Sequence, residues 1–187
     1  MLDTSKDVHP RIKELRLESE YPFASHYIQT PMGRMHYLDE GAENERSTVL
    51  AVHGNPTWSF LYRALVKGLS AERRIVVPDH IGFGLSEKPD DEAAYTLKAH
   101  IDHLEALVLH LDLTDITLVM QDWGGPIGLG VAARHPGRDQ GACGDEHIWV
   151  LPTGRRDEPG KTQVAPAAPH DAVQRSRRFH GAPLGLL

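Results

Sequence analysis

The chain has 187 residues, of which 40% are hydrophobic and 25% charged, and its formal net charge is −6. This length and composition are typical of one globular domain with a sizeable core. The acidic balance argues against binding to nucleic acid or to an anionic membrane, because like charges repel. The single cysteine, Cys143, excludes an intramolecular disulfide and a multi-cysteine metal site.

The first 20 residues are polar and lack the apolar run of a secretory signal. No later apolar stretch reaches the length of a membrane span. We therefore expect a cytoplasmic protein whose residues 1–20 form an N-terminal arm.

Residues 21–136 alternate between strand-like and helix-like patterns. Strands are expected at 26–30, 34–41, 47–54, 73–80 and 115–122, the first two as a hairpin, and helices at 57–70, 95–113 and 125–135. The helix 95–113 places its apolar side chains on one face: Leu97, Ile101, Leu104, Val108 and Leu111. This alternation predicts an α/β fold with a mostly parallel sheet and helices on its faces. Ligand chemistry then belongs at the carboxyl ends of the strands.

Both "HGNP" (53–56) and "QDWGG" (121–125) fall at such strand ends. The second fits a nucleophile elbow, in which a strand turns sharply into a helix and exposes a reactive side chain. Asp122 takes the nucleophile position, and Gly124 and Gly125 leave room for the helix to pack near the strand. The alternative is that Asp122 is only a helix N-cap, a position that Asp favours.

An aspartate nucleophile suits displacement at an sp3 carbon that bears a good leaving group, because its first attack needs no general base. The product is an alkyl ester on Asp122, and its hydrolysis requires an activated water and donors for the oxyanion. In this architecture the donors come from Trp123 and from the loop at Asn55. The Trp123 indole and the Asn55 amide can also hydrogen-bond to a departing halide. The alternative interpretations are that Trp123 only packs in the core and that Asn55 is only a turn residue before Pro56.

Three motifs, "HGNPTWSFLYR", "PDHIGFGLSEKP" and "QDWGGPIG", together resemble those of the haloalkane dehalogenases of the α/β-hydrolase superfamily. The resemblance covers roughly residues 21–136. It implies the N-terminal half of an α/β-hydrolase fold, with Asp122 as nucleophile, Asn55 and Trp123 as the halide-stabilising pair, and small halogenated alkanes and water as reactants. No cofactor is implied. Epoxide hydrolases share the D-W-G-G elbow, but they usually resemble "HGFP" where this chain has Asn55.

Two other features point to structure rather than to a site. The turn from Asp79 to Ser86 resembles a structural turn of the family, since Glu87 replaces the third glycine of a dinucleotide loop. His100 and His103 have helical spacing but no HExxH context, so we expect a solvated face and no metal site.

From about Gly137 the periodicity stops, and residues 137–187 predict a disordered tail without a cap domain. Residues 139–153 can be encoded so that skipping one base yields "IRALVVMNTSGFCPP", which contains an apolar strand. We therefore hypothesise that the tail after about Arg138 is frameshifted and non-native; the alternative is a natural disordered tail. The strand 115–122 would then be an exposed sheet edge.

The histidine and the acid that complete the family's second half-reaction are not found in matching motifs. His135, His147, His170 and His180 follow Asp122, but none lies in such a motif. The sequence thus predicts a dehalogenase-type chain that is inactive or limited to the first half-reaction. Its alternatives are an epoxide hydrolase fragment and a non-catalytic half-fold that binds or dimerises.

Overall fold

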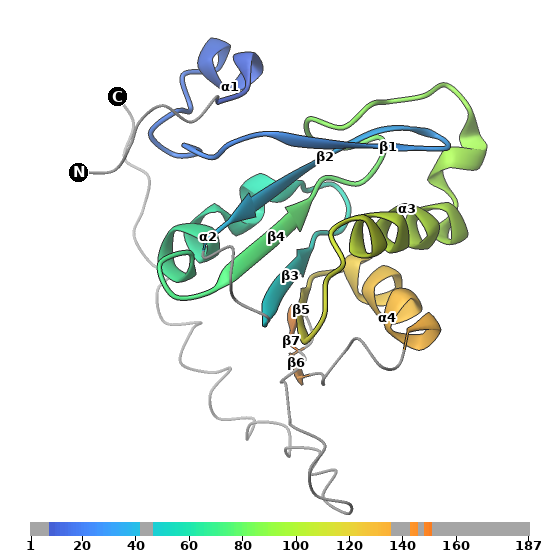
Figure 1. Cartoon of the computed structure of the whole chain (residues 1–187). Coiled ribbons are helices and arrows are strands. Elements are labelled where there is room, and N and C mark those ends of the chain that lie inside the picture. Colours follow the sequence, from blue (N-terminus) through green and yellow to red (C-terminus); the bar gives the residue numbers. More distant parts are fainter. Residues whose placement is uncertain (1–7, 42–46, 136–142, 146–147, 151–187) are drawn as a thin grey trace, which may run out of the picture. The chain divides into compact units, whose positions relative to one another are not determined.

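The computed structural model of the protein describes residues 8–41, 47–135, 143–145 and 148–150 (Figure 1). The chain divides into two units, Met1–Arg156 and Asp157–Leu187, and the second unit lies outside the described residues. The described helices are α1 (Pro10–Glu14), η1 (Ser59–Tyr62), α2 (Arg63–Leu69), η2 (Glu92–Tyr95), α3 (Leu97–His110) and α4 (Gly124–Arg134). The described strands are β1 (His26–Thr30), β2 (Gly33–Glu40), β3 (Thr48–Val52), β4 (Arg74–Pro78), β5 (Ile116–Met120), β6 (Cys143–Asp145) and β7 (Ile148–Val150).

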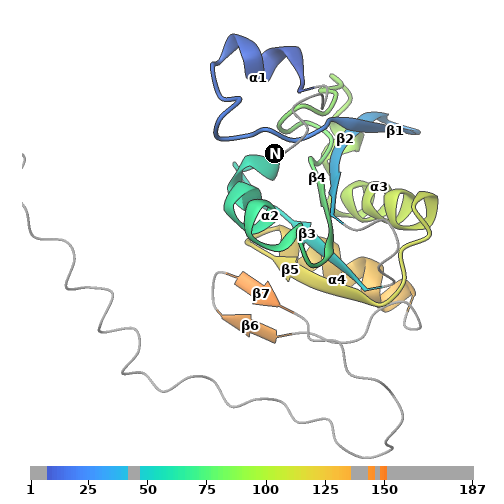
Figure 2. The same ribbon diagram turned by 60° about the vertical axis from the view of Figure 1, so that its left-hand side comes forward.

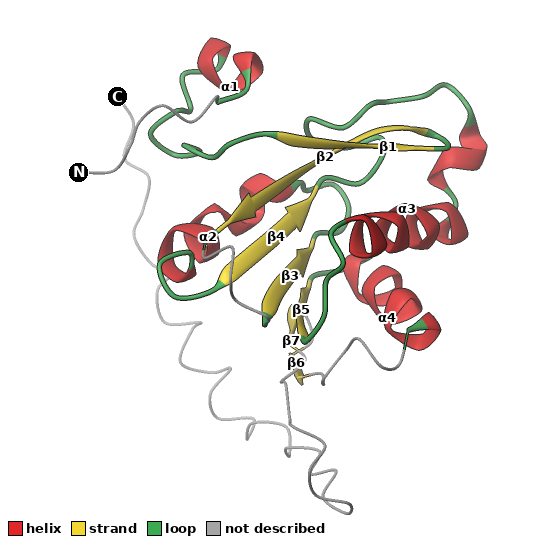
Figure 3. Cartoon of the chain, in the orientation of Figure 1, coloured by secondary structure: helices red, strands yellow, loops and turns green. Residues whose placement is uncertain are grey.

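The strands form one mixed sheet with the order β1-β2-β4-β3-β5-β7-β6 (Figure 3). β4, β3 and β5 are parallel neighbours, which confirms the α/β prediction for the centre of the sheet. β1 and β2 form the expected hairpin, with Thr30 opposite Gly33 at its turn. β2 then runs antiparallel to β4. The carboxyl ends of β3, β4 and β5 therefore meet at one edge of the sheet.

Helices cover both faces of this sheet, α2 on one and α3 with α4 on the other (Figure 2). The alternation of side chains along β3 explains the two layers. Leu50 and Val52 pack in the cluster under α3 and α4, whereas Val49 and Ala51 pack in the cluster under α2. Because both faces are covered, every residue of β3 is buried, as expected for a central parallel strand.

The segment expected as an N-terminal arm contains the short helix α1. Ile12 of this helix is fully buried, and it packs in the same cluster as Tyr21 and Val66. Tyr21 makes an edge-to-face contact with Phe23, with ring centroids 5.0 Å apart. The described part of the arm thus adds apolar cover to the α2 face.

Two short strands lie where the sequence predicts a low-order tail. β7 pairs antiparallel with the end of β5, with Val119 opposite Val150 and Met120 opposite Trp149, and β6 pairs with β7. The expectation that β5 is an open edge is therefore wrong over these two residues. The other residues of 136–187 lie outside the described part of the chain, and the frameshift hypothesis stays a prediction.

The turn after β4 is built around the buried carboxylate of Asp79. This carboxylate accepts hydrogen bonds from the backbone N–H of Ser59 at 2.7 Å and of Leu85 at 2.8 Å, and it lies 2.9 Å from His36 Nδ1. Burial alone raises its pKa, but the hydrogen bond and charge of His36 and the Leu85 N–H outweigh it and lower the pKa. Gly84, at φ +48°, approaches so closely that a Cβ would overlap the carboxylate. The interpretation of this motif as a structural turn is confirmed.

The expectation that His100 and His103 lie on a solvated face of α3 is wrong. They expose only 8% and 2% of their surface, whereas Leu97, expected on the apolar face, is 38% exposed. Both rings belong to a row of buried histidines that starts with His53 and His80 after β3 and β4. Ring centroids are 4.3 Å apart for His53 and His80 and 5.2 Å apart for His80 and His100. A neutral imidazole can pack like an apolar ring, which residue type alone does not reveal.

Burial lowers the pKa of each of the four histidines, that of His100 to about 4. The charges of neighbouring histidines lower the pKa of His80 and His100 further, whereas the hydrogen bond from His53 to the Gly54 carbonyl partly opposes the shift at His53. The folded state therefore keeps these rings neutral at pH values where the unfolded chain binds protons.

None of the helices in the described ranges is long and apolar enough to cross a membrane.

We predict that Gly124→Ala destabilises the fold by about 1–3 kcal/mol, because the new methyl group would overlap the backbone carbonyl of Val52 and push α4 away from β3. Gly68→Ala is the matched control. A Cβ at Gly68 in α2 meets nothing within 4 Å, so it should stabilise the fold by about 0.5–1 kcal/mol through helix propensity. Urea unfolding measures both changes, and equal effects of the two variants would contradict this account.

We also predict that the free energy of unfolding falls as the pH decreases from about 6.5 to 5. Over this window the unfolded chain protonates histidines that the folded chain holds neutral, so stability is present at neutral pH and is lost on acidification. Each buried histidine contributes a slope of up to about 1.4 kcal/mol per pH unit.

His103→Leu removes one of these groups, so its stability should fall less steeply with decreasing pH than that of the unmodified chain. Unfolding curves at several pH values test this, and identical slopes for the two proteins would refute the assignment.

Candidate active site

Asp122 lies on a sharp turn between β5 and α4, with φ +52°. A non-glycine residue rarely adopts this left-handed conformation, although Asp tolerates it better than most. Backbone hydrogen bonds hold the reversal: the Gln121 N–H donates to the Val52 carbonyl at 3.2 Å, and the Gly125 N–H donates to the Asp122 carbonyl at 2.9 Å. The turn therefore has the strained geometry expected of a nucleophile elbow.

The Asp122 side chain is held by the loop after β3. The backbone N–H of Asn55 donates to Asp122 Oδ1 at 3.0 Å, which joins two loops 67 residues apart in sequence. Gly54 makes this approach possible, since a Cβ there would lie 2.5 Å from Asp122 Oδ1. At α4 the N-cap residue is Trp123, and it makes no side-chain capping bond. The structure thus favours the elbow over the N-cap alternative, because the carboxylate bonds across to Asn55.

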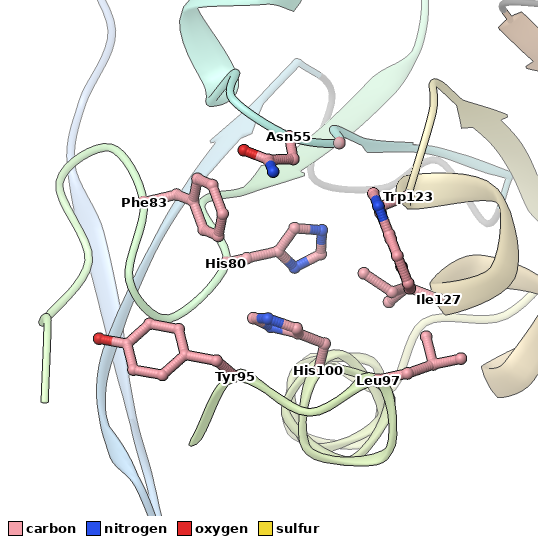
Figure 4. Close-up of a pocket in the computed structure, with 9 residues that line it drawn as sticks. Asn55, His80, Phe83, Tyr95, Leu97, His100, Trp123 and Ile127 are labelled. Atoms are coloured by element: carbon pink, nitrogen blue, oxygen red, sulfur yellow. The ribbon is translucent and has the colours of Figure 1, made fainter. Parts of the chain in front are cut away.

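A cavity of about 320 Å³ opens beside this turn (Figure 4). Asn55 and Trp123 both line it, so the structure brings the two predicted halide donors to the same cavity. Trp123 is 52% exposed, which excludes simple core packing. Asn55 is also exposed, and a cis peptide bond joins it to Pro56. Asn55 is therefore both a turn residue and a residue of the cavity wall.

Several lining residues were missed by reasoning from the sequence. They are His80, Phe83, Tyr95, Leu97, His100 and Ile127. His80 could have been found, because it follows β4, whose carboxyl end lies at the same edge as those of β3 and β5. The position of His100 could not, since it depends on how α3 packs against this edge.

The later histidines do not complete the site within the described residues. His135 lies at the end of α4, where its Nε2 is 2.6 Å from Glu105 Oε1, and it does not line the cavity. His147, His170 and His180 lie outside the described residues. The described part of the chain also contains no group of three or more His, Cys, Asp or Glu residues that could hold a metal ion.

Comparison with known proteins places these features in a family. Residues 47–141 match the model of the alpha/beta hydrolase fold family. A cis-3-alkyl-4-alkyloxetan-2-one decarboxylase of Shewanella oneidensis is 50% identical over 124 residues, which are 65% of this chain and 38% of that protein. A haloalkane dehalogenase of Mycolicibacterium paratuberculosis is 44% identical over 136 residues, which are 68% of this chain and 45% of that protein.

Among solved structures, a tetrameric haloalkane dehalogenase of Paraglaciecola agarilytica matches with a TM-score of 0.64 and 36% identity, over 69% of this chain and 45% of that one. The chain thus spans less than half the length of each of these three proteins. The matched family model covers half of the chain. The Asn55 loop, the turn at Asp122 and the strands β3, β4 and β5 all lie within the matched residues. The chain therefore belongs to the alpha/beta hydrolase fold family, within which it is similar to haloalkane dehalogenases and to an oxetan-2-one decarboxylase.

Proposed function

We propose that this site hydrolyses a carbon–halogen bond of a small halogenated alkane through an alkyl ester on Asp122. The observation that carries the proposal is the position of Asp122 on a strained turn, where its carboxylate accepts a hydrogen bond from the Asn55 N–H, while Asn55 and the adjacent Trp123 line a cavity. The cytoplasmic location stays a prediction from the polar N-terminal segment.

The first step is a displacement at carbon. An oxygen of Asp122 forms a bond to the sp3 carbon, the carbon–halogen bond breaks, and the halide leaves with the bonding electrons. The Asn55 N–H on Oδ1 orients the carboxylate, so that Oδ2 is the attacking atom. Uncharged N–H donors from Trp123 and Asn55 stabilise the halide as its charge develops.

The second step is attack of water on the ester carbonyl, which returns Asp122 and releases the alcohol. The carbonyl oxygen is then Oδ1, and it becomes the oxyanion next to the Asn55 N–H that already contacts it. This step needs a base to activate the water, and in the described ranges no histidine hydrogen-bonds to Asp122. We therefore propose that this chain stops at the ester.

A second candidate function follows from the relative of Shewanella oneidensis, whose identity of 50% exceeds the 44% of the dehalogenase. An oxetan-2-one has an sp3 ring carbon bound to oxygen. Asp122 can attack this carbon while the ring C–O bond breaks and a carboxylate forms. Loss of CO2 then forms a carbon–carbon double bond and expels Asp122. This cycle needs neither water nor a general base.

Incubation with 1-bromohexane should add one hexyl group to the chain, located on Asp122 by peptide mass spectrometry. Asp122→Asn should remain unmodified, because an amide is not a carboxylate nucleophile. A cis-3,4-dialkyloxetan-2-one should release CO2 over many turnovers only if the second candidate function holds.

Sustained bromide release at many equivalents per protein would show that the ester is hydrolysed and would contradict the proposed arrest. A cooperative melt with neither adduct nor CO2 release would instead favour the non-catalytic binding module, and would overturn both enzymatic proposals. Faster reaction of an epoxide than of the bromoalkane would favour the epoxide hydrolase alternative.

Trp123→Phe should slow formation of the hexyl adduct about 10- to 100-fold, because it keeps an aromatic ring and loses the N–H donor. Trp58→Phe is the matched control. Trp58 stacks on Phe60 and packs at a tilt against Tyr21 in the cluster under α2, with ring centroids 5.5 and 5.3 Å away, and it does not line the cavity. The rate of adduct formation by intact mass compares the two variants, and equal rates would remove the indole from the mechanism.

A further inference from the structure

One peptide unit of the loop after β3 connects the elbow to a second set of hydrogen bonds. The N–H group of this unit belongs to Asn55 and donates to Asp122 Oδ1 at 3.0 Å. Its carbonyl group belongs to Gly54, and the two groups share one planar peptide bond. The direction of the Asn55 N–H is therefore set by the contacts that hold the Gly54 carbonyl.

Three donors converge on the Gly54 carbonyl oxygen. The Thr57 hydroxyl donates to it at 2.9 Å and the Thr57 backbone N–H at 3.0 Å. The third donor is His53 Nδ1, which lies 2.9 Å away. His53 Nε2 accepts the backbone N–H of His80, so the neutral ring carries its proton on Nδ1. The carbonyl is thus held by His53 at the end of β3 and by Thr57 in the loop that follows.

The N–H group of Gly54 is held as well. It donates to Gln121 Oε1 at 3.3 Å. Two consecutive N–H groups of the loop, those of Gly54 and Asn55, therefore face two consecutive side chains of the elbow, Gln121 and Asp122. Thr57 Oγ1 lies 3.5 Å from Gln121 Oε1, a longer contact than its 2.9 Å to the Gly54 carbonyl. The carbonyl is therefore the main partner of the Thr57 hydroxyl.

We propose that Thr57 is a positioning residue, whose hydroxyl fixes the Gly54–Asn55 peptide unit so that its N–H stays on the Asp122 carboxylate. A donor on a peptide carbonyl also polarises the peptide, which strengthens its N–H as a donor. Thr57 is partly exposed, whereas His53 is fully buried, so the hydroxyl can be removed without opening the core. That the oriented N–H assists a reaction rests on the proposed function, whereas the orientation itself does not.

Thr57→Val tests this role, because it keeps the shape of the side chain and loses only the hydroxyl. As the hydrogen bond to Asp122 weakens, the 1H signal of the Asn55 N–H should move upfield in NMR spectra of the full chain, and this amide should exchange with solvent faster. Thr57→Ser keeps the hydroxyl and should retain the signal and the exchange rate of the unmodified chain. An unmoved Asn55 signal in Thr57→Val, or an equal shift in Thr57→Ser, would overturn the proposal.

Thr30→Val is the matched control. Thr30 lies at the hairpin turn between β1 and β2, and its hydroxyl donates to the Gly33 carbonyl at 2.6 Å. This variant also removes a threonine hydroxyl from a glycine carbonyl in a turn, but neither residue lines the cavity. Each variant is first checked for a cooperative melt. The Asn55 signal should stay in place in Thr30→Val, and the same shift there would contradict a specific role for Thr57.

The rate of the proposed reaction gives a second measure. Formation of the hexyl adduct on Asp122 should be about two- to tenfold slower in Thr57→Val, the factor that corresponds to one net hydrogen bond. The rate should be unchanged in Thr57→Ser and Thr30→Val. Equal rates in the unmodified chain and in Thr57→Val would contradict a role of Thr57 in the reaction.

The two measurements distinguish the two proposals. A shifted Asn55 signal in Thr57→Val, together with no hexyl adduct on the unmodified chain, would overturn the proposed function and leave Thr57 as the residue that orients this N–H. A hexyl adduct on the unmodified chain with an unmoved Asn55 signal in Thr57→Val would overturn only the inference about Thr57.

Discussion

The site depends on the contact between two chain reversals, the one after β3 and the one after β5. β3 and β5 are adjacent and parallel, with Val52 opposite Met120, so both strands end at the same edge. Two glycines then allow the backbones to meet: Gly54 lies against the Asp122 side chain, and Gly124 lies against the Val52 carbonyl. A single methyl group at either position would overlap these neighbours and force the two chain reversals to shift.

This constraint explains why a left-handed aspartate is tolerated. The conformation at Asp122 costs free energy, but it allows the backbone to leave β5 and enter α4 within a few residues while the carboxylate stays exposed. α4 then packs on β3 and β5 through small residues, and Ile127 fills the cluster on that face. Strain at Asp122 and tight packing behind it are therefore two parts of one arrangement.

Buried polar groups surround the same edge of the sheet. Asp79 organises the turn after β4 by accepting backbone N–H groups. The rings of His53 and His80 each bond to the other's backbone, and His53 also donates to the Gly54 carbonyl. These bonds satisfy most of the polar atoms and fix the tautomers of the two rings. His80 also lines the cavity, so the same network that stabilises the strand ends shapes part of the cavity wall.

The sequence by itself predicted the central strands and the sharp turn at Asp122 that the structure contains. Apolar runs marked β3, β4 and β5, and the pattern around Asp122 marked the elbow, because these signals are local and depend on a few neighbouring residues. Tertiary structure decided the burial of His100 and His103, the cover that β7 gives to the end of β5, and the position of His80 in the cavity wall. The physical reason is that histidine can lie on the solvent-exposed surface or, when neutral, in a packed core. Only the neighbours that the fold brings together decide which of the two it occupies.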